Sequence, residues 1–287
     1  MQMNSPQPMN LRRSVFRALL DLLVTLLLWV YFLAGTLILP FYGMAHLFSN
    51  DREATFQGMN SRFYRGFFRL VQWLIPGLSL RIGADVRTLR STVIVSNHLS
   101  YLDPILFLSI FDRQKTIVRS DFFHYPIFGW VLKTAGYLPS SANGDLFSTL
   151  MIKRVEDMDR YLSTGGNLFI FPEGTRSRDG RLHPFSRGAF RIAARCRAPL
   201  GVVRITNTHR LFPPDRFLFH TGIREPVTIE LLALLHPEWD APDFSLNDLI
   251  ARVQALYDER ERQERERDFA EAGGPDGKPP AEGAGTP

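Results

Sequence analysis

The stretch "VIVSNHLSYLDPILFL", residues Val93–Leu108, decides the fold of this chain. It opens with β-branched apolar residues, which predict a buried strand over Thr92–Ser96. After a short turn, the apolar residues continue in a predicted helix over Ile105–Phe111. A buried strand followed closely by a helix is the repeating unit of α/β folds.

The same alternation continues outward from this stretch. Further strands are predicted at Thr116–Arg119, Asn167–Phe171, Leu200–Ile205 and Val227–Leu232. Helices are predicted at Leu146–Leu162 and Gly188–Arg195. We therefore expect an α/β fold with a mixed, largely parallel sheet flanked by helices. Functional groups in such sheets lie just past the carboxyl ends of the strands.

His98 follows the first strand, and Asp103 with Pro104 begins the helix after it. One interpretation is structural, because Asp at the N-cap and Pro at the next position commonly start helices, and His98 then belongs to the turn. The other is catalytic. A carboxylate near an imidazole can accept the ring N–H, which leaves the second nitrogen to take a proton from a hydroxyl. Local chemistry alone leaves both interpretations open.

A second stretch, "NLFIFPEGTRSRDGRLHPFSRGAF" over Asn167–Phe190, also places polar residues after an apolar strand. Gly174 allows backbone to approach a ligand closely, and Thr175 and Arg176 are groups that bind phosphate. Arg187 leads into the next helix, whose first amides could contribute to an anion site. An ordinary loop is the alternative.

The two stretches together resemble the glycerolipid acyltransferases, a family that includes the bacterial 1-acyl-glycerol-3-phosphate acyltransferases. "NHLSYLD" matches the family's NHxxxxD motif and "FPEGTRSRDG" its FPEGTRS motif, while "APLGVVRI" stands where the family has an apolar strand that begins with proline. The resemblance covers roughly Phe63 to Leu232.

The resemblance implies a role for each matching residue. His98 would be the general base on the acceptor's hydroxyl, and Asp103 would orient it. The hydroxyl would attack an acyl thioester directly, so acyl-CoA or acyl-carrier protein is the expected co-substrate and no other cofactor or metal is expected. The residues implied in binding the acceptor, with Glu173 organising the loop, are Arg119, Glu173, Gly174, Thr175, Arg176 and Arg187.

Some positions depart from the family pattern. Ser141 or Ala142 stands where the family has a phosphate-binding arginine, Ser186 replaces a frequent lysine, and Val202 replaces a usual proline. The expected acceptor is a lysophospholipid, first of all 1-acyl-glycerol-3-phosphate. The alternatives are another lyso-lipid, such as a lyso-amino-acid lipid, and a non-catalytic membrane-binding relative.

Composition narrows the other classes of function. Cys196 is the only cysteine, so neither an internal disulfide nor a CxxC zinc site can form. The chain lacks HExxH, GxxxxGK and GxSxG, and the missing serine elbow disfavours a thioesterase or lipase. The net charge of +5 comes mainly from arginine, which suits phosphate and anionic lipid. No nucleic-acid partner is expected.

The N-terminal part has the pattern of a membrane protein. Arg12, Arg13 and Arg17 precede an apolar run, Leu22–Phe48, that is interrupted near Pro40. We expect this run to enter the bilayer and return, bending near Pro40, with a buried core helix as the alternative. The catalytic domain and the N-terminus would then share the cytoplasmic face of the inner membrane.

Next comes an amphipathic segment, Arg62–Leu78, with arginines on one helical face. It predicts either an interfacial helix in the headgroup region or a helix packed on the protein's own sheet. We expect an N-terminal membrane region over 1–79, an acyltransferase α/β domain over 80–257, and a charged helix end with a disordered tail over 258–287.

Overall fold

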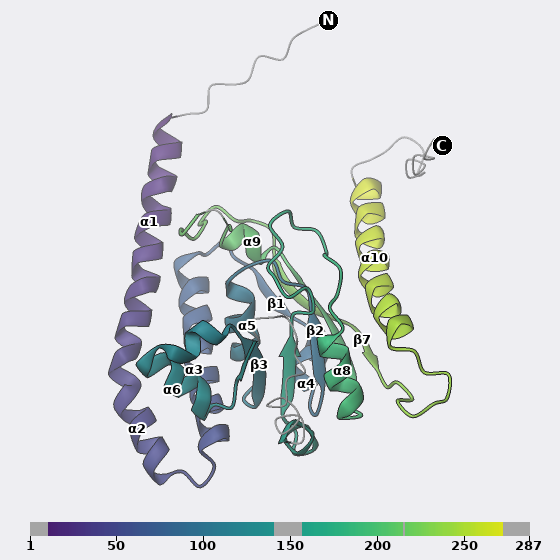
Figure 1. The fold of residues 1–287 in the computed structure, drawn as a ribbon. Helices are drawn as coiled ribbons and strands as arrows, with labels where there is room; N and C mark the ends of the chain where they lie inside the picture. Colours follow the sequence, from purple (N-terminus) through teal and green to yellow (C-terminus); the bar gives the residue numbers. More distant parts are fainter. Residues whose placement is uncertain (1–10, 141–156, 215, 272–287) are drawn as a thin grey trace, which may run out of the picture.

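The computed structural model describes residues 11–140, 157–214 and 216–271. In this part of the chain, one sheet holds seven strands in the order β1-β7-β6-β2-β5-β3-β4 (Figure 1). The strands are β1 Leu80–Ile82, β2 Val93–Ser96, β3 Gln114–Val118, β4 Leu138–Pro139, β5 Asn167–Ile170, β6 Leu200–Thr206 and β7 Val227–Leu235. All neighbours pair in parallel except β6 and β7. The predicted fold class is confirmed.

The helices cover both faces of this sheet (Figure 1). They are α1 Leu11–Ala34, α2 Leu39–Phe48, α3 Arg52–Leu74, α4 Ala84–Thr88, α5 Leu102–Ile110, α6 Pro126–Thr134, α8 Gly188–Arg195, α9 Thr208–Leu211 and α10 Leu246–Glu271, with 3-10 turns η1 Gly35–Ile38 and η2 Ser120–His124. Side chains alternate along β2: Ile94 packs with α3 and α5, whereas Val93 and Val95 pack with α8 and α10. Burial on both faces explains why the strands are apolar throughout.

The edge strands β1 and β4 were not predicted from the sequence. They span three and two residues, which is too short for a hydrophobic pattern to appear. The five strands expected from sequence are all present, and no end is shifted by more than three residues. Such shifts are ordinary at element ends.

Helix α5 begins earlier than the sequence predicts. Its N-cap is Tyr101, so Asp103 lies at the second helical position and not at the cap. The prediction of Asp103 as N-cap is therefore wrong. The carboxylate of Asp103 instead reaches back to the turn and accepts the backbone N–H groups of Leu99 and Ser100.

The apolar N-terminal run continues in one direction past Pro40. In Figure 1, α1, η1 and α2 follow one another along the same flank, and the chain turns back only after Phe48. Pro40 stands in the first turn of α2, where a helix needs no N–H donor, so the proline does not reverse the chain. The stretch Val15–Phe48 is long and apolar enough to cross a membrane, and no other described helix is.

Helix α3 packs on the protein itself, which is one of the two readings of the amphipathic segment. It starts ten residues before the predicted Arg62, because the side chain of Asp51 caps it by accepting the N–H of Ala54 at 2.9 Å. Phe67 and Val71 on its apolar face are fully buried in the core shared with α5.

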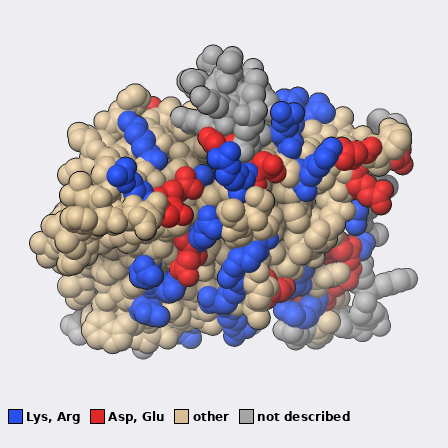
Figure 2. All heavy atoms as spheres, turned by 90° about the horizontal axis from the view of Figure 1, so that it is seen from below, with Lys and Arg blue, Asp and Glu red and all other residues tan. Residues whose placement is uncertain are grey.

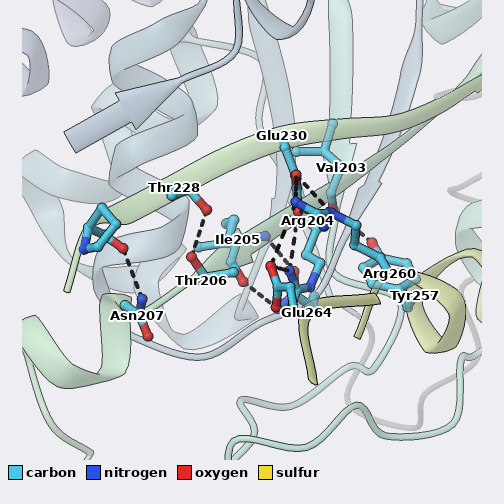
Figure 3. Close-up of polar contacts among 12 residues, drawn as sticks. Val203, Arg204, Ile205, Thr206, Asn207, Thr228, Glu230, Tyr257, Arg260 and Glu264 are labelled. Atoms are coloured by element: carbon cyan, nitrogen blue, oxygen red, sulfur yellow. Dashed lines mark hydrogen bonds and ion pairs between the residues drawn. The ribbon is translucent and has the colours of Figure 1, made fainter. Parts of the chain in front are cut away.

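Helix α10 is fastened to the sheet by a network of charges (Figure 3). The guanidinium of Arg204 in β6 donates two hydrogen bonds of 2.7 Å to Glu264 in α10 and one of 3.2 Å to Glu230 in β7. Arg260 of α10 also donates to Glu230. The Tyr257 hydroxyl donates to the backbone of β6 at 2.7 Å.

Several predictions fall outside the described residues. Ser141, Ala142 and the tail after residue 271 do so entirely. Of the predicted helix Leu146–Leu162, only the end is described, and residues 157–163 are helical.

Candidate active site

The Asn97 side chain holds the carboxyl end of β2 in place by forming two hydrogen bonds of the kind that strand backbones form. The Asn97 amide donates to the carbonyl of Ile205 in β6 at 2.9 Å and accepts the N–H of the same residue at 2.7 Å. The side chain thereby extends the pairing of β2 with β6 by one step. His98, the next residue, is fixed where the strand ends.

His98 and Asp103 form a hydrogen-bonded pair. Nδ1 of His98 lies 2.9 Å from Oδ2 of Asp103. The same oxygen accepts the backbone N–H groups of Leu99 at 2.6 Å and Ser100 at 2.7 Å. Asp103 is fully buried, and donors converging on one oxygen stabilise its negative charge. The carboxylate can therefore fix the imidazole with a proton on Nδ1.

The imidazole is also packed from one side. The ring of Phe171, just past β5, stacks on it with centroids 4.3 Å apart and planes tilted by 20°. The His98 side chain remains 16% exposed. Since Nδ1 is engaged by Asp103, Nε2 is the nitrogen that can meet a substrate proton, and no described residue forms a hydrogen bond with it.

Glu173 joins the second motif to the first. One carboxylate oxygen accepts the N–H of His98 at 2.8 Å, and the other accepts the N–H of His183 at 3.0 Å. Burial raises the pKa of Glu173, while these two N–H groups act in the opposite direction. The N–H of Ser177 also donates to the carbonyl of His98 at 2.8 Å. Both motifs thus share one backbone framework.

Gly174 makes the sharp turn that follows β5. Its φ is +71°, in the left-handed region that favours glycine, and its N–H donates to the carbonyl of Phe171 at 3.1 Å. Gly174 and the next residue, Thr175, are both exposed. The turn therefore presents a hydroxyl and open backbone beside His98.

Arg176 rests on an aromatic ring that sequence reasoning missed. Its guanidinium carbon lies 4.0 Å from the centroid of the Tyr101 ring. Nε and Nη1 of Arg176 are buried and have no hydrogen-bond partner among the described residues. The ring fixes the cation while leaving its donors for an anion. The sequence did contain a hint of this contact, because Tyr101 is an aromatic residue in the variable part of the NHxxxxD motif.

The other two predicted cations, Arg187 and Arg119, have no described contact with Arg176 or Tyr101. Arg187 is exposed at the N-cap of α8, which is tied to the loop by the N–H of Ser186 donating to the carbonyl of Pro172 at 2.7 Å. Arg119 is 76% exposed and pairs with Asp121 at 2.6 Å. No described contact joins Arg119 to His98 or Arg176.

His209 is a second residue near the site that sequence reasoning did not find. It is half-buried in α9, and burial lowers its pKa, with Arg210 acting the same way and Asp103 against it. A lone histidine in a short helix gives no signal in sequence. Within the described ranges, no three His, Cys, Asp or Glu side chains are grouped to hold a metal ion.

Comparison with known proteins finds sequences named as acyltransferases. Residues 80–206 match the family model Acyltransferase. A chloroplastic 1-acyl-sn-glycerol-3-phosphate acyltransferase of Brassica napus is 36% identical over 134 residues, which are 46% of this chain and 38% of that protein. A chloroplastic enzyme of the same name from Arabidopsis thaliana is 34% identical, over 46% of this chain and 37% of that protein. The chain thus spans less than two fifths of either relative.

A solved structure gives a wider match. The 1-acyl-sn-glycerophosphate acyltransferase of Thermotoga maritima superimposes with a TM-score of 0.60 over 82% of this chain and 93% of that one, at 20% identity. The two proteins share a fold. Both motifs lie inside the segment, residues 80–206, that matches the family model Acyltransferase.

Proposed function

We propose that this chain is a membrane-bound acyltransferase that moves a fatty acyl group from acyl-CoA or acyl-carrier protein to the free hydroxyl of a lysophospholipid. The observation that carries the proposal is His98, whose ring pairs with buried Asp103 and whose N–H donates to Glu173 of the second motif. The names of the relatives support 1-acyl-glycerol-3-phosphate as the first acceptor to consider.

In the proposed reaction, Nε2 of His98 takes the proton of the acceptor hydroxyl while its oxygen attacks the thioester carbonyl. Asp103 stabilises the imidazolium that forms. The tetrahedral intermediate then collapses, the carbon–sulfur bond breaks, and the thiolate receives the proton from His98. An ester and a free thiol result, with no acyl-enzyme.

The acceptor's phosphate would lie against the turn that follows β5. Arg176 supplies guanidinium donors, and Thr175 and the backbone at Gly174 supply neutral ones. Arg187 would contribute from the start of α8, next to Ser186, whose N–H donates to the carbonyl of Pro172. Arg119 would have to leave Asp121 to take part.

The membrane assignment also belongs to this proposal. Thioester donors are cytosolic, so the catalytic domain would work at the cytoplasmic face of the inner membrane. The apolar stretch Val15–Phe48 supports attachment to a bilayer.

One assay separates the alternatives. Purified chain receives acyl-CoA or acyl-carrier protein, and free thiol is measured with and without each of a panel of lyso-lipids. We expect thiol release that depends on 1-acyl-glycerol-3-phosphate and is lost in His98→Ala. Rapid acylation of a phosphate-free lyso-lipid alone would overturn the phosphate acceptor, and acceptor-independent release would indicate a hydrolase. No release with any acceptor would favour a non-catalytic relative.

A further inference from the structure

We propose that the chain has a second lipid site, apart from both motifs, where an anionic phospholipid of the bilayer binds between α1 and the loop that precedes β7. The inference uses the membrane attachment of the proposed function but not its chemistry. It starts from a cavity of about 740 Å³, a size usual for a ligand pocket.

The lining of this cavity has two kinds of side chain. Phe16 and Leu20 of α1 and Ile223 of the loop are apolar, whereas α1 and the loop each contribute one arginine to the lining, Arg17 and Arg224. No lining residue belongs to the NHxxxxD or FPEGTRS motif. The site is therefore distinct from the one that holds His98.

Hydrogen bonds join α1 to the loop on the other side of the cavity, so the shape of the cavity is fixed by the fold. Oδ1 of Asp21 in α1 accepts the N–H of Thr221 at 2.8 Å and its hydroxyl at 2.6 Å. One turn later, the Thr25 hydroxyl accepts the N–H of Phe219 at 2.9 Å. Figure 1 shows this loop against the upper half of α1.

The arginines at the cavity have no described ion-pair partner, although acids lie close by. Asp21 is engaged by Thr221 and also faces His220, with 3.5 Å between Oδ2 and Nδ1. Glu225 is paired with Arg210. Two guanidinium forks in one partly apolar cavity suit a phosphate group.

The surroundings select a lipid over a soluble phosphate. Phe16, Leu19 and Leu23 are 67%, 60% and 54% exposed on the helix that forms one wall. A phosphodiester held by Arg17 and Arg224 could lay its acyl chains along these residues, which a soluble phosphate cannot do. Each arginine near a membrane surface favours anionic over neutral lipid, and together they predict a preference on the order of 30-fold.

The test uses the full chain in nanodiscs containing equal amounts of phosphatidylglycerol and phosphatidylcholine. After extraction into detergent, the lipid that stays bound is identified by native mass spectrometry. We expect retained phosphatidylglycerol, lost when Arg17→Gln and Arg224→Gln are combined. Arg87→Gln combined with Arg252→Gln removes the same charge from exposed positions elsewhere and should keep the lipid. All four side chains are exposed, so the fold should survive, which melting checks.

Three outcomes would overturn the inference. They are equal retention of both lipids, equal loss in the control variant, and release of the lipid by inorganic phosphate as readily as by soluble short-chain phosphatidylglycerol. Failure of the proposed function gives a different result. A chain with no acyl transfer, or the His98→Ala variant, should still retain phosphatidylglycerol if this second site exists.

Discussion

Asp103 has two tasks at the residue scale, because one of its oxygens holds the turn after β2 and also the imidazole of His98. Its Oδ2 accepts two backbone N–H groups and the His98 ring, and the side chain has no contact with solvent. Holding the turn and orienting the imidazole are therefore compatible roles for this aspartate, although it is not the N-cap. Separating them requires a change that removes the charge but keeps an acceptor.

Asp103→Asn makes that change. The amide oxygen can still accept the N–H groups of Leu99 and Ser100, but it cannot stabilise an imidazolium. We expect kcat to fall by about 10²–10⁴-fold, as for loss of general-base catalysis, with a smaller effect on melting temperature. His98→Ala should lose a similar factor, because residues that act as one unit are not additive. Normal turnover by folded Asp103→Asn would contradict the proposed role.

Tyr101→Leu tests the ring beneath Arg176. A cation–π contact contributes about 0.5–2 kcal/mol, so its loss should raise the acceptor KM by about 2-fold to 30-fold. The donor KM should stay constant. Tyr101→Phe keeps a ring face at the 4.0 Å position and should behave like the unchanged protein. An equal rise in both variants would implicate the hydroxyl and not the ring.

His209 should make stability depend on pH. Burial lowers its pKa below 6.5, Arg210 adds to the effect, and Asp103 opposes it. The unfolded chain then binds more protons than the folded one below about pH 6.5, so this contribution is complete above that pH and is lost as pH falls. His209→Gln should flatten the fall in melting temperature between about pH 7 and 5. Melting curves at several pH values check this, and an unchanged slope would refute it.

The sequence could name His98, Asp103 and the residues of the second motif as candidates because short motifs contain them directly, and the structure brings His98, Asp103 and Glu173 together. It could not predict that Tyr101 supports Arg176, since that contact joins two turns 75 residues apart, as does the bond from the His98 N–H to Glu173. Nor could it find His209, whose place beside the site depends on how β6 ends.

At the scale of elements, α10 shows how a charged helix can be part of the fold. Its sequence alternates charges, which is typical of a solvated helix. The pattern therefore did not indicate that one face of α10 packs against the sheet. Arg204 is only 13% exposed and lies between Glu230 and Glu264, so one strand residue orders partners on β7 and α10 (Figure 3). The contact could not be read from sequence because its partners lie 26 and 60 residues away.

Arg204→Met tests this docking. It removes the hydrogen bonds from Arg204 to two carboxylates that still pair with Arg260, so the free energy of unfolding should fall by about 1.5–3 kcal/mol, the range for hydrogen bonds to charged groups. Denaturant unfolding measures it. Arg262→Met removes an exposed pair with Glu259 on the same helix and should change stability by less than about 0.5 kcal/mol. Equal effects would mean that the network is only a surface feature.

At the scale of the whole molecule, the apolar N-terminal helices and the charged surface lie apart. Seen from the end opposite the candidate site, Lys and Arg mingle with Asp and Glu over much of the face, as on surfaces that meet water (Figure 2). The left side of Figure 1 carries α1 and α2, whose outward side chains are large and apolar. The molecule therefore has one flank suited to lipid.

The geometry of that flank constrains how the chain meets a bilayer. From Asp21 onward, α1 is bonded to the domain, and α2 continues beside α3. Among the described residues, only Leu11–Leu20 precedes these bonds, a length of about 15 Å at 1.5 Å per residue, which is half of a hydrocarbon core. A full crossing by Val15–Phe48 would pull the domain into the membrane. We therefore expect the flank to lie in one leaflet, with the domain on a single side.

Cysteine labelling in liposomes tests this arrangement. The chain's own cysteine should contribute little to the labelling signal. Cys196 is buried, and burial raises the pKa of its thiol to about 11, so it should react slowly with maleimide. Leu26→Cys and Leu37→Cys lie on the apolar flank and should be shielded by lipid from a water-soluble maleimide. Arg195→Cys and Asp258→Cys lie on exposed surface and should react fully.

Detergent provides the control for this experiment. All four introduced thiols should react once the bilayer is dissolved, because Leu26 and Leu37 are 53% and 75% exposed in the protein itself. If Leu26→Cys and Leu37→Cys react in liposomes as fast as Arg195→Cys, the flank does not contact lipid. If Arg195→Cys and Asp258→Cys are accessible from opposite sides of the bilayer, the domain does not lie on a single side. Both results concern only the position of the protein relative to the bilayer. The catalytic role of His98 is tested separately by its variants.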